Sequence, residues 1–397
     1  MLVYLDNAST TKPYEEVVQS MNDVLLHNFG NPSSLHKMGL NAEKEVKKAR
    51  AIIAETLGVE PNEITFTSGG TEADNSVISG IAQSKKKQGN KIITTKVEHP
   101  AVLSQCKKLE ENGFDVAYID VDEKCNLNLE QLESELNDRT ILMTIMAANN
   151  EVGTCMPVAE LARNKKDKGF NNVCVHSDAI QAYGKIDLRN INADAMSLSG
   201  HKIHGAKGVG AIYTRSGVNW KPLMVGGGQE RDLRSGTENV QGIVGFAKAA
   251  EMCFGNMEAR INQMAKARNY LLNGIKSEIK DIKINGYDEE FQFGETQKFL
   301  PSILNVSFLG VRGEVLLHTL EQDNIFVSTR SACSSTSNTG SHVLDAMGCT
   351  EKEIEGAIRF GFSQFNTIEE MDFVLDKLKQ AIKKMRMLTQ FSTGGKK

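Results

Sequence analysis

The chain has 397 residues, of which 40% are hydrophobic and 24% are charged, and its formal net charge is −4. That length allows two domains with a large buried core, and the composition is ordinary for a soluble globular protein. The charge gives no sign of a nucleic-acid partner or an anionic membrane surface, and no apolar run approaches the roughly 20 residues of a membrane helix.

Seven cysteines are spread irregularly along the chain, without a Cys-x-x-Cys pair. Their odd number and spacing argue against a disulfide framework and structural zinc, and fit a reducing cytoplasm. His201 and His204 have no carboxylate or cysteine close by in sequence, which also argues against zinc. Residues 1–7 are too short and too acidic for a signal peptide. The sequence therefore predicts a cytoplasmic protein without a metal site.

The first half of the chain alternates predicted strands and helices. A short segment with Pro13 precedes the first helix, and Gly58 ends the second. The expected helices are residues 15–27, 39–57, 72–82, 102–113, 129–136 and 158–169. The expected strands are residues 64–67, 91–97, 116–120, 140–147, 173–176 and 195–198. This alternation predicts an α/β fold with a mostly parallel sheet and helical crossovers.

A glycine-rich loop separates the strand at residues 64–67 from the helix that begins near Glu72. Such a loop places free backbone N–H groups and the positive end of a helix together, which suits a phosphate. The Walker lysine pattern and the G-x-G-x-x-G spacing are both missing, so neither an NTPase nor a dinucleotide fold is supported. Gly70 and Thr71 are consistent with an anion site or, equally, with a plain turn.

Polar residues follow the predicted strands at the points where the strands end. The carboxyl ends of parallel strands meet at one edge of a sheet, where ligands bind. We therefore expect one crevice that gathers Gly70, Thr71, His99, Asn150, Asp178, Gln181, Ser199, His201 and Lys202.

A lysine, an aspartate, a histidine and an anion-binding helix start in one crevice fit pyridoxal phosphate. Lys202 would form a Schiff base with the cofactor aldehyde, and Asp178 would pair with the pyridinium nitrogen. The loop at Gly70 would take the phosphate, and His99 would stack on the ring. Structural alternatives stay open for these residues. Lys202 could be an ordinary surface lysine, Asp178 could cap the following helix, and His99 could form a hydrogen bond at the end of its strand.

The remainder of the chain predicts a second, smaller α+β unit. A polar glycine-rich loop over residues 225–240 leads into one long predicted helix over residues 243–282. Beyond it we expect strands at residues 303–308 and 357–362, helices at residues 313–322, 341–347 and 368–387, and a polar tail. We assign residues 15–255 to a large domain and residues 1–14 and 256–397 to a small one.

Several short motifs, spread nearly end to end, resemble those of one enzyme family. They are residues 4–11, 68–75, 98–101, 149–153, 199–203, 226–237 and 331–333. The chain resembles a cysteine desulfurase of the NifS/IscS type, within the class V aminotransferase-like group of fold-type I pyridoxal-phosphate enzymes. The resemblance implies a large domain with a mostly parallel seven-stranded sheet between helices, and a small α+β domain that carries the catalytic cysteine loop.

The resemblance also implies a role for each matching residue. Lys202 is the Schiff-base lysine, and His99 stacks on the ring and moves protons. Asp178 pairs with the pyridine nitrogen, Gln181 contacts the ring hydroxyl, and Asn150 lies near that hydroxyl and the substrate.

Further implied roles concern the phosphate and the substrate. The implied phosphate ligands are Gly70, Thr71, Ser199 and His201. Thr237 is expected to reach the phosphate of the other subunit of a homodimer. Arg359 is expected to bind the carboxylate of L-cysteine with its guanidinium fork, although an ordinary ion pair is the alternative.

The resemblance implies that Cys333, in a polar loop, is the nucleophile. The alternative is that Cys333 is an incidental thiol without a catalytic role. Its thiolate would take the sulfur of L-cysteine, L-alanine would leave, and the Cys333 persulfide would pass to an acceptor protein that docks near this loop. Iron–sulfur cluster assembly, tRNA thiolation and cofactor biosynthesis all stay open. Arg330 stands where relatives usually have a small residue. The alternatives are a selenocysteine lyase, another class V aminotransferase-like enzyme, or a non-catalytic scaffold.

Overall fold

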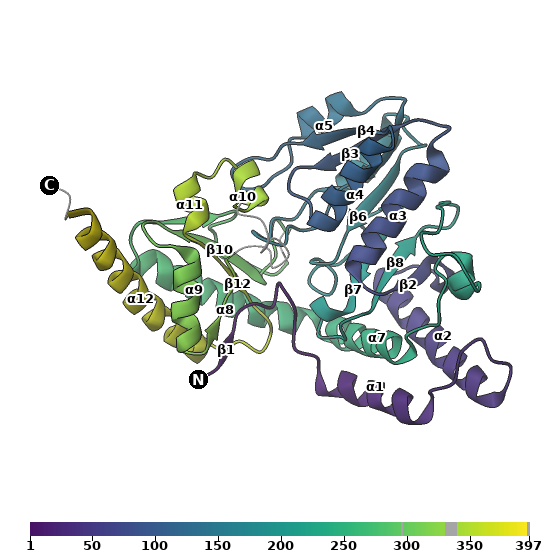
Figure 1. Cartoon of the computed structure of the whole chain (residues 1–397), viewed down its shortest axis with the longest axis horizontal. Helices are drawn as coiled ribbons and strands as arrows, with labels where there is room; N and C mark the ends of the chain where they lie inside the picture. The colour runs from purple at the N-terminus through teal and green to yellow at the C-terminus, as the bar shows by residue number, and fades with distance from the viewer. Residues whose placement is uncertain (295–296, 330–339, 395–397) are drawn as a thin grey trace.

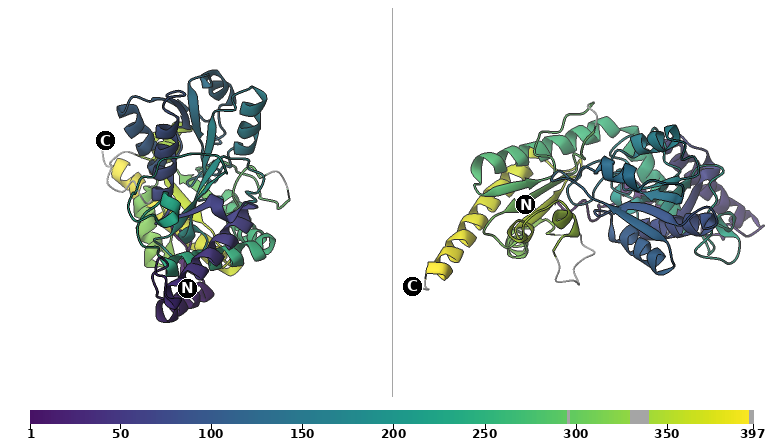
Figure 2. Two further views of the ribbon diagram at one scale, coloured as in Figure 1. Left: turned by 90° about the vertical axis from the view of Figure 1, so that its right-hand side faces the viewer. Right: turned by 90° about the horizontal axis from the view of Figure 1, so that it is seen from above.

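Two sheets organise the chain in the computed structural model, which describes residues 1–294, 297–329 and 340–394. A seven-stranded sheet with its helices forms one body, on the right in Figure 1, and a three-stranded sheet with its helices forms the other. The view from above in Figure 2 shows the same two bodies side by side. None of the helices in the described ranges is long and apolar enough to cross a membrane.

The seven-stranded sheet has the strand order β2-β8-β7-β6-β5-β3-β4. Its strands are β2 (Ile64–Thr67), β3 (Lys91–Thr95), β4 (Asp115–Ile119), β5 (Thr140–Thr144), β6 (Cys174–Asp178), β7 (Ala195–Ser199) and β8 (Gly210–Thr214). Only β8 runs antiparallel to its two neighbours; the other four pairings are parallel. The predicted α/β class and the mostly parallel seven-stranded sheet are confirmed.

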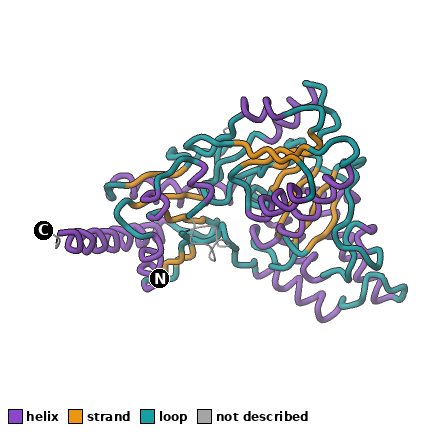
Figure 3. Tube along the Cα trace, turned by 45° about the horizontal axis from the view of Figure 1, so that its top comes forward, coloured by secondary structure: helices purple, strands orange, loops and turns teal. Residues whose placement is uncertain are grey.

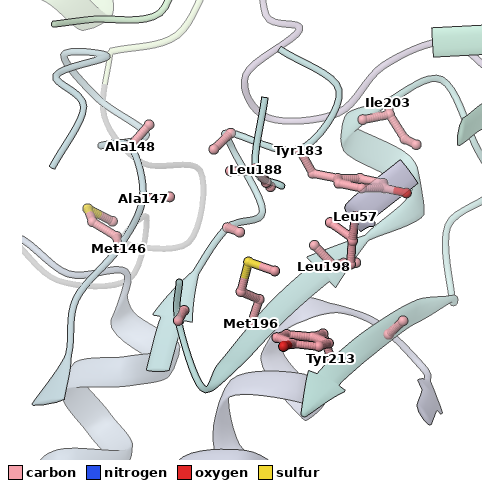
Figure 4. Packing of buried hydrophobic residues seen from close by; sticks show 14 of the residues in the cluster. Leu57, Met146, Ala147, Ala148, Tyr183, Leu188, Met196, Leu198, Ile203 and Tyr213 are labelled. Atoms are coloured by element: carbon pink, nitrogen blue, oxygen red, sulfur yellow. The ribbon is translucent and has the colours of Figure 1, made fainter. Parts of the chain in front are cut away.

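Helices cover both faces of this sheet because its strands are apolar on both sides. In β3, for example, Ile92 packs into the cluster that includes α3 and α4, while Ile93 packs into the larger cluster on the opposite face. Figure 4 shows part of that larger cluster, with Met196 and Leu198 beside Tyr213. The helices of this body are α1 (Glu15–His27), α2 (Lys37–Leu57), α3 (Gly70–Lys85), α4 (Pro100–Glu111), α5 (Leu129–Glu135), α6 (Val158–Asp167) and α7 (Val240–Gly255).

The second body is built on an antiparallel sheet of order β12-β10-β9 and on a short parallel pair, β1 with β11. The strands are β1 (Val3–Tyr4), β9 (Ile282–Asn285), β10 (Ile303–Phe308), β11 (Ile325–Phe326) and β12 (Ala357–Gly361). The helices are α8 (Met257–Glu278), α9 (Gly313–Gln322), α10 (His342–Ala346), α11 (Glu351–Glu355) and α12 (Ile368–Gly394). Figure 3 separates the two groups of strands in orange. The N-terminal strand thus packs with the C-terminal residues, and the domain limits at residues 14 and 255 stay a prediction.

The single long helix predicted over residues 243–282 is wrong. The structure has two helices, α7 and α8, with Asn256 between them at φ −140° and ψ 41°. Gly255 and Asn256 are poor helix formers. Arg260 of α8 then turns back and donates to the carbonyls of Cys253 (3.0 Å) and Gly184 (3.1 Å), so an orphan carbonyl at the end of α7 is satisfied from outside the helix.

Arg268 of α8 is the largest fully buried side chain, and it holds the second body together. Its guanidinium donates to the carbonyls of Ile303 (3.2 Å), Tyr287 (2.9 Å) and Glu289 (2.9 Å), and it lies 4.5 Å from the ring centre of Phe299. The segments at residues 287–289 and 299–303 are thereby both fixed to α8 by one side chain.

Replacing Arg268 by Ala should lower the free energy of unfolding by about 3 kcal/mol, because three buried carbonyls lose their donor and a cavity forms. Urea unfolding followed by circular dichroism measures the change. Lys266→Ala on an exposed face of the same helix is the matched control and should be near neutral. Equal effects of the two substitutions would contradict this role of Arg268.

Candidate active site

A cavity of about 760 Å³, counted out to its open mouth, lies at the carboxyl ends of β6 and β7. It brings together ten of the twelve predicted site residues, namely Gly70, Thr71, His99, Asn150, Asp178, Gln181, Ser199, His201, Lys202 and Arg359. The predicted crevice at the strand ends is therefore where these residues meet. Ala8 and Ser9 also line the cavity. Neither was predicted from the sequence as a site residue, although both lie in the motif at residues 4–11.

Lys202 lies in a short 3-10 turn that follows β7 directly. Its Nζ donates to the carbonyl of Ala8 (2.7 Å) and to the carbonyl of Ser9 (2.8 Å). The N-terminal segment therefore closes over the lysine, and two of its backbone oxygens hold the amine at the cavity.

Asp178 is the last residue of β6, and its Oδ1 accepts the N–H of Ile180 at 2.9 Å. Burial raises the pKa of this carboxyl to about 6, while the charge of Lys202 opposes the rise. Behind it, Asp74 of α3 is fully buried, and burial together with Asp178 holds the pKa of Asp74 well above its usual range. Asp178 is therefore the more readily ionised carboxyl of the pair, and the one that lines the cavity.

His99 caps the N-terminus of α4, because its Nδ1 accepts the N–H of Ala101 at 3.2 Å and Pro100 takes the first helical position. Burial lowers the pKa of this imidazole to about 4, with Lys202 and His342 adding to the effect. The ring is thus neutral near pH 7. Since Nδ1 accepts a hydrogen bond, the proton lies on Nε2.

The start of α3 forms one end of the cavity. A Cβ added at Gly70 would lie 2.1 Å from Cδ1 of Ile180, so glycine lets the helix N-terminus approach the loop after β6. The hydroxyl of Ser199 is buried there without a hydrogen-bond partner among the residues described. The Nδ1 of His201 lies 3.2 Å from the hydroxyl of Thr10, and burial lowers the pKa of that imidazole to about 4.

These features fit pyridoxal phosphate. The helix N-terminus and the unpaired Ser199 hydroxyl suit its phosphate, the buried Asp178 carboxyl suits its pyridine nitrogen, and Lys202 suits its aldehyde. The neutral His99 ring borders the same cavity.

Arg359 reaches the cavity from β12 in the other body and is almost fully buried. It donates to the carbonyl of Asn150 (2.9 Å), the hydroxyl of Ser9 (2.6 Å) and the carboxylate of Asp6 (3.1 Å). Its Nε has no partner among the described residues. Arg359 therefore joins both bodies and the N-terminal segment, and it keeps one donor for a ligand.

Two predicted site residues remain to be placed. Thr237 is exposed on the loop before α7. Cys333 lies outside the described residues. The chain on either side is placed next to the site: the N–H of Ser328 bonds to the carbonyl of Arg359 (3.2 Å), and His342 bonds to the carbonyl of Glu98 (2.9 Å).

In the described part of the chain, no three His, Cys, Asp or Glu side chains come together as metal ligands. His204 instead packs its ring 4.7 Å from that of Tyr14 and bonds to the carbonyl of Lys12 at 2.8 Å.

Glu98, next to His99, is a buried residue that the sequence did not single out. Its Oε1 accepts the N–H of Met146 (2.9 Å) and the hydroxyl of Thr95 (3.0 Å), which fixes the chain before His99 against the loop that follows β5. Burial raises the pKa of Glu98 to about 8, so the carboxyl is protonated at neutral pH.

The family profile and the relatives that match this chain all agree on one enzyme family. The family profile "Aminotransferase class-V" matches residues 3–374. A protein of Clostridium botulinum named cysteine desulfurase IscS is 42% identical over 389 residues, which cover 98% of this chain and 96% of that protein. A protein of the same name from Methanosarcina thermophila is 42% identical, with coverage of 98% and 93%.

Solved structures agree with these relatives. One described as a NifS-like protein is 41% identical, with a TM-score of 0.88 and coverage of 96% of this chain and 100% of that one. Another, described as SspA in complex with cysteine, is 33% identical, with a TM-score of 0.78 and coverage of 92% and 100%.

The raised pKa of Glu98 predicts a pH dependence of stability. The folded state binds a proton that the unfolded state loses above its ordinary pKa of 4.5, so this contribution is full below pH 4.5 and is lost as the pH rises through about 8. The free energy of unfolding should fall over that window by up to about 1.4 kcal/mol per pH unit more in the wild type than in Glu98→Gln. Urea unfolding at several pH values measures it, and parallel curves for the two proteins would contradict the assignment.

Proposed function

The chain belongs to the class V aminotransferase family and is a cysteine desulfurase that depends on pyridoxal phosphate, and we propose that the cavity described above is its active site. The observation that carries the proposal is the meeting of Lys202, Asp178, His99 and the start of α3 around one cavity. When bound there, pyridoxal phosphate supplies an aldehyde for the substrate amine and a ring that takes up electrons released at Cα.

Each side chain has a task that its surroundings support. Asp178 holds the pyridine nitrogen, and its carboxyl, the more acidic of the buried pair, is suited to carry the negative charge. Gln181 and Asn150 line the same cavity and would hold the ring hydroxyl. The phosphate is held at the N-terminus of α3 by the residues proposed for it, Gly70, Thr71, Ser199 and His201.

Binding and proton transfer fall to three residues. The carboxylate of L-cysteine binds Arg359 through the unpaired Nε and a guanidinium nitrogen now shared with Ser9 and Asp6. Lys202, once free as an amine, removes the proton from Cα. His99, neutral with its proton on Nε2, stacks on the ring and exchanges a proton with the substrate.

The sulfur step belongs to Cys333. Its thiolate attacks the sulfur of L-cysteine, an S–S bond forms at Cys333, and the substrate C–S bond breaks with its electrons returning to the alanine skeleton. Protonation of that carbon skeleton gives L-alanine, so L-cysteine and one thiol yield L-alanine and one persulfide. The persulfide then passes to an acceptor protein of iron–sulfur cluster assembly or of tRNA or cofactor thiolation, in the cytoplasm.

We further propose a homodimer in which Thr237 reaches the phosphate of the other subunit. Thr237 is exposed and lies outside the cavity of its own chain. Its loop begins at exposed apolar residues, with Val225 80% exposed, and Leu35 between α1 and α2 is 93% exposed. Leu223 and Met224 beside Val225 are exposed as well, and a contiguous run of exposed apolar side chains is typical of a surface that another protein covers.

Cys333→Ser should abolish release of sulfide from L-cysteine in the presence of a thiol, because serine cannot form a persulfide. Cofactor binding, read from the visible absorbance, should be unchanged. Cys155→Ser is the matched control, since Cys155 lies outside the cavity, and it should keep full activity. Sulfide release at the wild-type rate from Cys333→Ser would overturn the mechanism.

If the protein is a homodimer, light scattering of the wild type should give twice the chain mass of 43.6 kDa. Leu35→Glu should shift the protein toward monomer and weaken cofactor binding at least tenfold, because Thr237 of the partner is then lost from the site. Val315→Glu, at an exposed valine of α9, is the control and should leave both unchanged. A monomeric wild type with full cofactor affinity would rule out the shared site.

A further inference from the structure

A buried lysine that lines no part of the cavity, Lys185, stands directly behind Gln181. Its Nζ donates to the carbonyl of Gln181 at 3.0 Å and approaches the side-chain Oε1 of the same residue at 3.5 Å. On its other side, the Gln181 amide donates from Nε2 to the carbonyl of Ala8 at 2.9 Å. An acceptor on one side and a donor on the other leave the amide a single orientation.

The carbonyl of Ala8 also accepts a hydrogen bond from the Lys202 amine. Lys202 donates to it at 2.7 Å, so one chain of polar contacts runs from Lys185 through the Gln181 amide to Ala8 and Lys202. A change at Lys185 is therefore transmitted to the reactive amine by direct contacts.

Among the described residues, no carboxylate forms an ion pair with Lys185. The groups that act on it are Lys202, Arg260 and the thiol of Cys253. Burial lowers its pKa to about 7, with Lys202 and Arg260 adding to the effect. Lys202 also acts on three other groups that line the cavity: it lowers the pKa values of the imidazoles of His99 and His201, which are both neutral at pH 7, and that of the Asp178 carboxyl.

We propose that Lys185 is a positioning residue of the active site: it fixes the Gln181 amide with its NH₂ toward Ala8 and the cavity, and its charge opposes a positive charge on Lys202. Lys185 is buried and Lys202 is partly buried, and two amines that act on each other electrostatically disfavour each other's protonation. A lysine is a better base and nucleophile when it is neutral. The inference deepens the proposed function, since it concerns the same lysine and the same amide.

The test follows Lys202 in the protein without cofactor. Reductive methylation at a series of pH values, with peptide mass spectrometry, gives the pH midpoint at which the Lys202 amine becomes reactive. In Lys185→Arg, which stays charged where Lys185, with its pKa of about 7, has become neutral, this midpoint should fall by about one pH unit. In Lys185→Met, which removes the second amine, the midpoint should stay at or above the wild-type value.

A second measurement tests the route through the amide. In the Gln181→Leu background, Lys185→Met should shift the absorbance titration of the bound cofactor by less than half as much as in the wild type, because coupled residues are not additive. Lys165→Met is the matched control: Lys165 is a buried lysine of the same body, paired with Asp194 at 2.8 Å, and its loss should not move the Lys202 midpoint.

An unchanged or raised Lys202 midpoint in folded Lys185→Arg, or an equal fall in Lys165→Met, would overturn the proposal. If Lys185→Arg does not fold, Lys185→Met decides, since a midpoint below the wild-type value in the absence of the second amine contradicts the mechanism. The labelling needs no turnover, so a protein that shows these shifts but does not release sulfide would refute the proposed function and leave this inference standing.

Discussion

The carbonyls of Ala8 and Ser9 are the point on which the site depends. Both carbonyls accept hydrogen bonds from the Lys202 amine, and the carbonyl of Ala8 accepts another from the Gln181 side-chain amide. The same short segment is tied to the second body, because Asn7 donates to the carbonyl of Gly361 (2.9 Å) and Ser9 accepts from Arg359. In Figure 1 this purple segment runs between the two bodies. The relative position of the two sheets and the direction of the reactive lysine are thus set by one stretch of backbone.

Burial explains how the cavity keeps its charges apart. Burial raises the pKa of Glu98 to about 8 and lowers that of His99 to about 4, so both are neutral near pH 7, and burial also holds the pKa of Asp74 well above its usual range. A neutral buried group costs far less than an ionised one. Asp178, the more readily ionised carboxyl of the buried pair, lines the cavity together with Lys202 and Arg359, and a carboxylate there is what a protonated pyridine ring needs.

Much of this could be predicted from the sequence because the signals were local. A β-branched run that ends in a polar cluster, such as the one before Asp178, shows both the strand and the edge of the sheet where its last residues lie. The site residues gathered as expected for that reason. The helix break at Asn256 was missed because Arg260 makes it possible through contacts with Gly184, which is distant in sequence. The pairing of Lys202 with Ala8 and Ser9 was missed because a backbone carbonyl has no side-chain signature.

The position of Lys185 is another feature that the sequence could not predict. In the sequence it is an unremarked lysine shortly after Gln181, and a solvated lysine would be the ordinary reading. It is buried because Gly184, at φ +72°, turns the chain back under the loop, in a space where a Cβ would lie 3.0 Å from Ile203. A residue with a left-handed backbone and no side chain thus places an amine behind the amide that faces the cavity. The chemistry of the site therefore rests on a conformational property of one glycine as well as on the residues that contact the ligand.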